Sequence, residues 1–189
     1  MSAPIVLDLE TKYRFQDVNR DLTKLGISVV GIYDYDRDVY ECYREFELTK
    51  LFPRLESASS IIGFNIRSFD LPVLVPYYVG NIQKLPMLDL LDDIEKFLGF
   101  RIALDELAKH TLGTKKTGHG LLAIEYFKQG EWDKLKDYCL SDVKITKELY
   151  EYGKKEGKIF YQDNKGKREI KVNWNLVSQT QDIPLTLPW

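Results

Sequence analysis

The chain alternates between short apolar runs of strand length and longer segments in which apolar residues recur at helical spacing. Continuous apolar runs predict three strands that are buried on both faces, at 4–10, 60–65 and 85–91. Two further pairs of segments predict antiparallel hairpins. The first pairs 26–36 with 39–46 around Arg37 and Asp38, and the second is formed by 158–174 with its turn at 164–166.

Helical spacing is clearest in 131–156, where one face carries Leu135, Tyr138, Asp142, Ile145 and Leu149. Other segments between the strands predict shorter helices, at 48–58, 69–80, 92–98, 103–112 and 119–128. Pro53 lies inside the first of these, and two prolines kink or delay the second. No clear pattern is visible in 175–189.

An early hairpin followed by apolar strands separated by helices predicts an α/β domain with a mixed sheet flanked by helices. The length of 189 residues, the 44% hydrophobic content and the 12 tyrosines and 9 phenylalanines are typical of one ordered globular domain. We expect this domain over 1–174, including the C-terminal hairpin, with a tail over 175–189. Its functional residues should gather at the carboxyl ends of the parallel strands.

The composition says more about the cellular compartment of the protein than about its substrate. No apolar run approaches the ~20 residues of a membrane helix, and no signal peptide is visible. Cys42 and Cys139 are too few for a disulfide framework or a cysteine zinc site, and they fit a reducing compartment, so we expect a cytoplasmic protein. The net charge of −2 neither supports nor excludes an acidic polymer as partner.

Four acids stand out at the expected edge of the sheet. Asp8 and Glu10 lie near the end of the first apolar strand and point to the same face. Asp70 follows the second apolar strand, and Asp142 lies on the inward face of 131–156. Four acids in one cleft would destabilise the fold unless cations lie between them, and oxygen ligands favour Mg²⁺ or Mn²⁺.

Each acid also has a simpler explanation. Asp8 and Glu10 could form a solvated strand edge. Asp70 could cap a helix or occupy its first turn, which is compatible with binding a metal. Asp142 could pair with a lysine or a backbone amide, and Tyr138 could be a core aromatic residue.

Three motifs occur in one order along the chain: D-L-E at 8–10, N-x-x-x-F-D at 65–70 and Y-x-x-x-D at 138–142. This set resembles the DEDD 3′–5′ exonucleases. The tyrosine resembles the DEDDy branch, which includes the proofreading domain of family B DNA polymerases. Over about residues 4–174, the chain is similar to a bacterial group of stand-alone or helicase-associated exonucleases related to that domain.

The resemblance implies a ribonuclease H-like fold and two-metal hydrolysis that releases nucleoside 5′-monophosphates from a 3′ end. It implies that Asp8, Glu10 and Asp142 bind one cation. Asp8 would bridge to the second cation, which Asp70 would reach directly or through water. Tyr138 would orient the attacking water, because a pKa near 10 makes it a poor base at neutral pH.

Four further residues are candidates for substrate contacts. Asn65 contacts substrate or only fixes a local turn, and Phe69 stacks on a base or packs in the core. Lys115 and Lys116 contact phosphate or belong to a solvated loop. His119 lies 23 residues before Asp142, farther than in the histidine branch of the family, and is expected to be a loop histidine.

We expect single-stranded nucleic acid as the substrate, DNA rather than RNA, and a monomer, with a helicase or another DNA-processing protein as a candidate partner and no membrane association. Two alternatives stay open. One is an exonuclease-like module that only binds nucleic acid, and the other is an RNA-trimming or structure-specific nuclease of the same fold. The presence of all four acids and the tyrosine favours an active enzyme.

Overall fold

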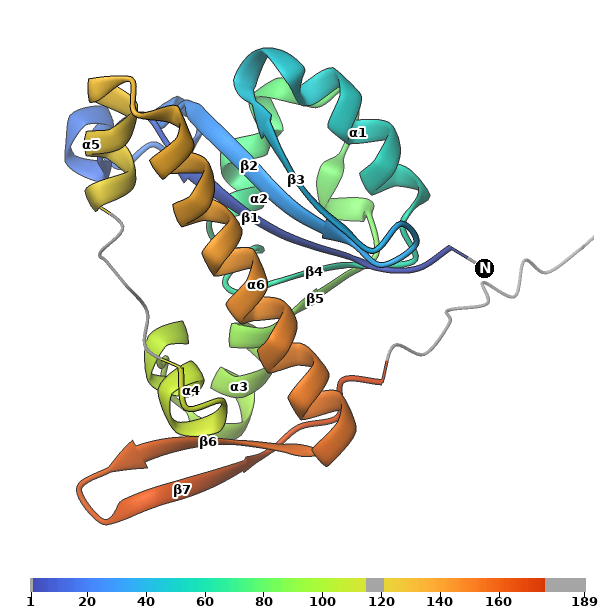
Figure 1. Ribbon diagram of the computed structural model, residues 1–189, viewed down its shortest axis with the longest axis vertical. Coiled ribbons are helices and arrows are strands. Elements are labelled where there is room, and N and C mark those ends of the chain that lie inside the picture. Colours follow the sequence, from blue (N-terminus) through green and yellow to red (C-terminus); the bar gives the residue numbers. More distant parts are fainter. Residues whose placement is uncertain (1, 115–120, 176–189) are drawn as a thin grey trace, which may run out of the picture.

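A five-stranded mixed sheet forms the centre of the molecule in the computed structural model, which describes residues 2–114 and 121–175 (Figure 1). The strand order is β3-β2-β1-β4-β5. The strands are β1 (Ile5–Thr11), β2 (Ile27–Asp34), β3 (Val39–Arg44), β4 (Ile61–Gly63) and β5 (Met87–Asp89). β2 is antiparallel to β1 and β3, whereas β1, β4 and β5 are parallel to one another. The predicted mixed α/β sheet is confirmed.

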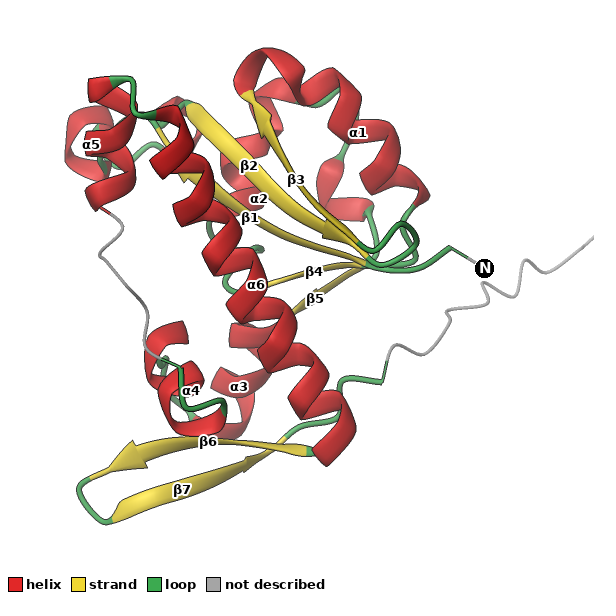
Figure 2. Ribbon diagram, in the orientation of Figure 1, coloured by secondary structure: helices red, strands yellow, loops and turns green. Residues whose placement is uncertain are grey.

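Helices cover both faces of this sheet (Figure 2). α1 (Leu48–Ser57) and α2 (Asp70–Leu74) pack on one face. The other face carries α6 (Trp132–Glu156), which runs along β1 and β2, and α5 (Leu121–Gln129), which packs beside α6. α3 (Leu90–Leu98) and α4 (Leu104–Thr111) lie near the C-terminal half of α6.

The alternation of side chains along β1 separates the two layers. Ile5, Leu7 and Leu9 are buried in the core with α1 and α2, whereas Val6 belongs to the core on the α6 side. Because successive strand residues point to opposite faces, Asp8 and Glu10 follow Val6 toward α6. The backbone of β1 therefore presents both acids to the helix that carries Asp142.

A separate hairpin of β6 (Lys158–Asp163) and β7 (Gly166–Lys171) follows α6 and packs on α3 and α4. Trp174, just beyond it, is buried, and its Nε1–H donates to Asp93 Oδ2 at 2.9 Å. A Cβ at Gly153 would lie 2.3 Å from the Trp174 ring, so the glycine lets this ring lie directly on α6. The predicted C-terminal hairpin is confirmed, although its second strand ends at Lys171.

The helix predicted at 69–80 is much shorter in the structure. α2 ends at Leu74 and continues only as a 3-10 helix, Val75–Tyr77. Pro76 has no N–H to donate to an α-helical hydrogen bond, and its ring crowds the carbonyl four residues earlier.

The predicted strands at 60–65 and 85–91 are also shorter than expected. β4 ends at Gly63, before Asn65 turns the chain with a φ of 69°. β5 ends at Asp89, whose side chain accepts hydrogen bonds from Leu91 N–H at 3.0 Å and Asp92 N–H at 3.4 Å and so begins α3.

The remaining helices and strands occur near their predicted positions. Residues 176–189 of the predicted tail lie outside the described residues. None of the helices that the structure describes has both the length and the apolar surface needed to cross a membrane.

Candidate active site

Three of the four predicted ligands lie together between the sheet and α6. One carboxylate oxygen from each of Asp8, Glu10 and Asp142 lies within 4.8 Å of the others. Asp142 is 6% exposed, and the two acids of β1 are half-buried. Like charges this close repel one another, so the arrangement favours a bound cation.

Gly31 of β2 allows α6 to come close to β1. It pairs with Asp8 across the antiparallel ladder. A Cβ at this position would lie 2.8 Å from Cys139 Sγ and 3.0 Å from Val143 Cγ2, both on α6. The Sγ atom also lies 3.6 Å from the backbone carbonyl oxygen of Asp8. The missing side chain of Gly31 thus brings the helix within reach of the β1 carboxylates.

Asp70 occupies the first position of α2, beside β1 rather than within the group of three. It is 3% exposed, and its Oδ1 accepts a hydrogen bond from Leu9 N–H at 3.1 Å. Burial raises the pKa of the Asp70 carboxyl to about 7; the Leu9 hydrogen bond opposes this rise and the nearby Asp89 charge adds to it. Asp70 therefore contacts the peptide unit between the two β1 acids.

Tyr138 lies four residues before Asp142 and shares its face of α6. The residue is 8% exposed, and its ring packs with Val29, Ala123 and Leu135. The structure thus places the tyrosine one helical turn from the acid cluster, with its ring fixed by the core.

Two hollows are lined by members of the acid cluster. The first, a cleft of 460 Å³, is lined by Asp8, Asp142, Asn65 and Arg101 among others. The second, of 450 Å³, is lined by Glu10, Phe15 and Phe69 among others, and the two phenylalanine ring centroids lie 5.8 Å apart. Asp8 and Asp142 therefore line the cleft, whereas Glu10 lines the second, aromatic hollow.

The structure leaves both explanations of Asn65 and of Phe69 open. Asn65 adopts the left-handed conformation, its N–H donates to Asp89 Oδ1 at 2.8 Å, and it also lines the cleft. Phe69 is half-buried against the core and lines the aromatic hollow. Substrate contact by either residue stays a prediction. Lys115, Lys116 and His119 lie outside the described residues.

Three residues at or beside the site were not singled out from the sequence: Gly31, Asp89 and Arg101. A glycine inside the apolar strand 26–36 is a signal for close backbone approach, and an aspartate before a helical segment is a signal for an N-cap. The first signal applies to Gly31 and the second to Asp89. Arg101 lies in the connection between α3 and α4 and has no local signal.

The donor set fits a hard divalent cation. It consists of carboxylate oxygens from Asp8, Glu10 and Asp142, and oxygen donors suit Mg²⁺ or Mn²⁺. This cluster could hold a metal ion, while the identity and number of ions stay predictions.

Solved structures similar to this chain include two nucleic-acid enzymes. The family B DNA polymerase of Pyrobaculum calidifontis matches with a TM-score of 0.61 and 18% identity, over 79% of this chain and 24% of the polymerase. RNase D of Trypanosoma brucei matches with a TM-score of 0.57 and 19% identity, over 80% of this chain and 57% of RNase D. The same RNase D in complex with RNA U12 matches with a TM-score of 0.57 and 19% identity, over 80% of this chain and 55% of that chain.

This chain thus spans about a quarter of the polymerase and somewhat more than half of RNase D. No curated protein matches the sequence. Residues 6–153, which include nearly all of the sheet and of α6 and the whole acid cluster, match the family model RNase_H_2, described as RNase_H superfamily. The mixed sheet with helices on both faces agrees with that match, and the chain belongs to the RNase H superfamily.

Proposed function

We propose that this protein is a metal-dependent 3′–5′ exonuclease that acts on single-stranded nucleic acid, DNA in preference to RNA. The reaction is hydrolysis of the terminal phosphodiester, with release of a nucleoside 5′-monophosphate. The observation that carries the proposal is the group of Asp8, Glu10 and Asp142, whose carboxylate oxygens lie within 4.8 Å of one another. Family membership and the order of the three motifs support it.

The assigned ligands come from three elements. Asp8, Glu10 and Asp142 would hold one divalent cation, and Asp8 and Asp70 would hold a second. Two such cations, when bound, supply the positive charge that stabilises the attacking and leaving oxygens of a phosphodiester. Tyr138 donates or accepts the hydrogen bond that orients the attacking water, and its packed ring keeps that geometry.

The two hollows suit the two parts of a nucleotide chain. The aromatic hollow beside Glu10 offers Phe15 and Phe69 to the terminal base, since stacking accepts every base. The cleft beside Asp8 and Asp142 takes the strand on the other side of the cleaved bond. In this arrangement the 3′ end of a linear strand fills the aromatic hollow, and the rest of the strand leaves through the cleft. Such binding requires a free end, as expected of an exonuclease.

The test is a digestion of 5′-labelled single strands, with DNA and RNA versions of the same sequence. The two versions are needed because the similar solved structures include a DNA polymerase and an RNase D bound to RNA. We expect a ladder that shortens from the 3′ end in Mn²⁺ or Mg²⁺ and no reaction with a chelator. A circular single strand should stay intact, because it has no end.

Two variants on α6 provide the control. Asp142→Asn removes one buried ligand charge, while Asp137→Asn removes the same charge from an exposed position five residues earlier. We expect loss of activity only in the first. Cleavage of the circle would indicate an endonuclease, shortening of RNA alone would indicate an RNA-trimming enzyme, and binding without any cleavage would leave a nucleic-acid-binding module.

A further inference from the structure

Arg101 lies in the turn between α3 and α4, close to the acid cluster in space. α3 ends at Leu98, and Gly99 takes the left-handed conformation, with a φ of 78°, that closes the helix. The chain then lines the cleft of 460 Å³ with Arg101 and the residues that follow it, opposite Asp8 and Asp142. The turn therefore delivers an arginine to the cleft that contains two of the proposed metal ligands.

Contacts from two other elements fix the guanidinium. Nη1 lies 3.0 Å from Glu95 Oε2 on α3, and Nη2 donates to Asn65 Oδ1 after β4. Asn65 is itself fixed through its N–H bond to the buried carboxylate of Asp89. The side chain of Arg101 is 44% exposed, so solvent and ligands can reach a group whose position is already set.

The charges of the residues that line the cleft suit a role for Arg101 in binding phosphate. Among the described residues that line it, Arg101 is the only basic one, while Asp8 and Asp142 are acidic. A nucleic-acid strand carries one negative charge per nucleotide and is repelled by carboxylates. A guanidinium has five N–H donors in a planar fork that matches two phosphate oxygens.

We propose that Arg101 is a substrate-binding residue that holds a backbone phosphate of the strand in this cleft, next to the phosphodiester that is cleaved. The proposal rests on the function proposed above, because it names the part of the same site that holds the polymer. Asn65 then acts as a positioning residue, since its side-chain oxygen orients the guanidinium. A purely structural role, in which Arg101 only ties α3 to the loop after β4, makes different predictions.

The first measurement is the salt dependence of binding to a fluorescent single-stranded oligonucleotide in chelator, where no cleavage occurs. Arg101→Gln should lower the slope of log affinity against log salt by about 0.7, the value for one phosphate contact on a single strand. Arg101→Lys should keep the slope, because it keeps the charge. In Mn²⁺, Arg101→Gln should raise KM about 10- to 100-fold, as expected for one charged hydrogen-bonded contact, with a smaller change in kcat.

Arg67→Gln is the matched control. Arg67 is 48% exposed, pairs with Asp92 at 3.7 Å between Nε and Oδ2, and does not line the cleft. We expect it to leave the slope and KM unchanged. The rise in melting temperature with Mn²⁺ should be equal in wild type and Arg101→Gln, which would show that the acid cluster is intact.

A substrate-side measurement keeps the test independent of folding. Single phosphodiesters of the oligonucleotide are replaced in turn by neutral methylphosphonates, and one linkage should weaken binding to wild type but not to Arg101→Gln. An unchanged slope and KM in Arg101→Gln, or the same sensitivity to every linkage in both proteins, would overturn the proposal. Absence of any binding to wild type would overturn it as well.

Failure of the nuclease proposal would look different. A wild-type protein that binds the strand but never cleaves it would refute the exonuclease, while the salt slopes and the methylphosphonate series would still decide the role of Arg101. Cleavage with equal kinetics in wild type and Arg101→Gln would support the exonuclease and refute the phosphate contact.

Discussion

The carboxylate of Asp70 holds the backbone of Leu9, because its Oδ1 accepts the Leu9 N–H at 3.1 Å. Leu9 separates the two β1 acids, so this hydrogen bond joins the start of α2 to the strand segment that carries Asp8 and Glu10. Asp70 thus contacts the backbone of the strand that carries two of the clustered acids, but its own carboxylate is not one of the three in the cluster.

Asp70→Asn should separate the structural and metal-binding roles of this residue. The asparagine oxygen can still accept the Leu9 N–H, and the variant carries no buried charge, so the melting temperature in chelator should stay equal or rise. The rise in melting temperature caused by Mn²⁺ should become smaller, because a ligand charge is lost. Asp137→Asn, an exposed change on α6, is the control. A full Mn²⁺ response in Asp70→Asn would remove Asp70 from the ligand set.

Gly31→Ala should disturb the site from the α6 side of the sheet. The new methyl group would lie 2.8 Å from Cys139 Sγ, so α6 must shift or the core must strain, at a cost of about 1–3 kcal/mol in unfolding free energy. Because α6 carries Asp142, the Mn²⁺ response and the activity should fall as well. Denaturant titration gives the stability, and metal-dependent melting gives the response.

The double variant Gly31→Ala/Cys139→Ala tests whether contact with Cys139 causes the loss of stability in Gly31→Ala. Removal of the sulfur atom should recover part of the loss, which appears as a coupling energy in a double-mutant cycle. Additive effects of the two changes would mean that contact with Cys139 is not the source of the strain.

Tyr138→Phe should affect turnover more than stability. The ring, its packing and the four acids stay, so unfolding free energy should change by about 0.5–1.5 kcal/mol and the Mn²⁺ response should persist. Turnover should fall ~10- to 1000-fold, as expected when one positioning interaction is lost in the transition state. Asp142→Ala should lose activity and the metal response together. An unchanged single-turnover rate in Tyr138→Phe would mean that the tyrosine only fills the core.

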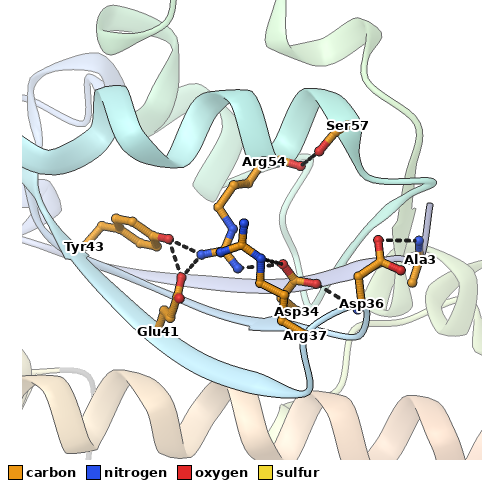
Figure 3. Close-up of polar contacts among 8 residues, drawn as sticks. All are labelled: Ala3, Asp34, Asp36, Arg37, Glu41, Tyr43, Arg54 and Ser57. Atoms are coloured by element: carbon orange, nitrogen blue, oxygen red, sulfur yellow. Dashed lines mark hydrogen bonds and ion pairs between the residues drawn. The ribbon is translucent and has the colours of Figure 1, made fainter.

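The ion-pair network of Arg54 should make the free energy of unfolding depend on pH in the acidic range (Figure 3). Arg54 lies 2.6 Å from Asp34 Oδ2 and also contacts Glu41 and Tyr43. Burial alone would raise the pKa of the Asp34 carboxyl, but hydrogen bonds from Arg54 and from Asp36 N–H outweigh it and hold the pKa below its ordinary value. The stabilisation is therefore complete above the ordinary pKa and is lost as the pH falls through the lowered one.

Asp34→Asn should remove this dependence. The variant should be less stable than wild type at neutral pH, and the difference should shrink as the solution is acidified. Asp36→Asn is the matched control, since Asp36 is exposed and accepts only Ala3 N–H among the contacts drawn (Figure 3). Denaturant titrations at several pH values measure the effect. A constant difference at every pH would show that the charge of Asp34 does not contribute.

Local patterns were sufficient for most of the fold. The apolar runs determined β1, β4 and β5, and helical spacing placed α6 with Tyr138 and Asp142 on its inward face. Strand alternation put Asp8 and Glu10 on one face, because that period depends on the backbone alone. The pattern did not place element ends that depend on one side chain: Asp89 ends β5 by capping α3, and Pro76 stops the α-helical hydrogen bonding after Leu74.

The tertiary structure decided which of these residues meet. Asp70 is a carboxylic acid like the other three, but its hydrogen bond to Leu9 and its deep burial depend on how α2 packs against β1. The close approach of α6 depends on the space left by Gly31, and the contact of Arg101 with Asn65 joins residues 36 positions apart. Sequence periodicity reports the direction of a side chain within its own element. Distances between elements follow from the packing of the whole core, which no local pattern contains.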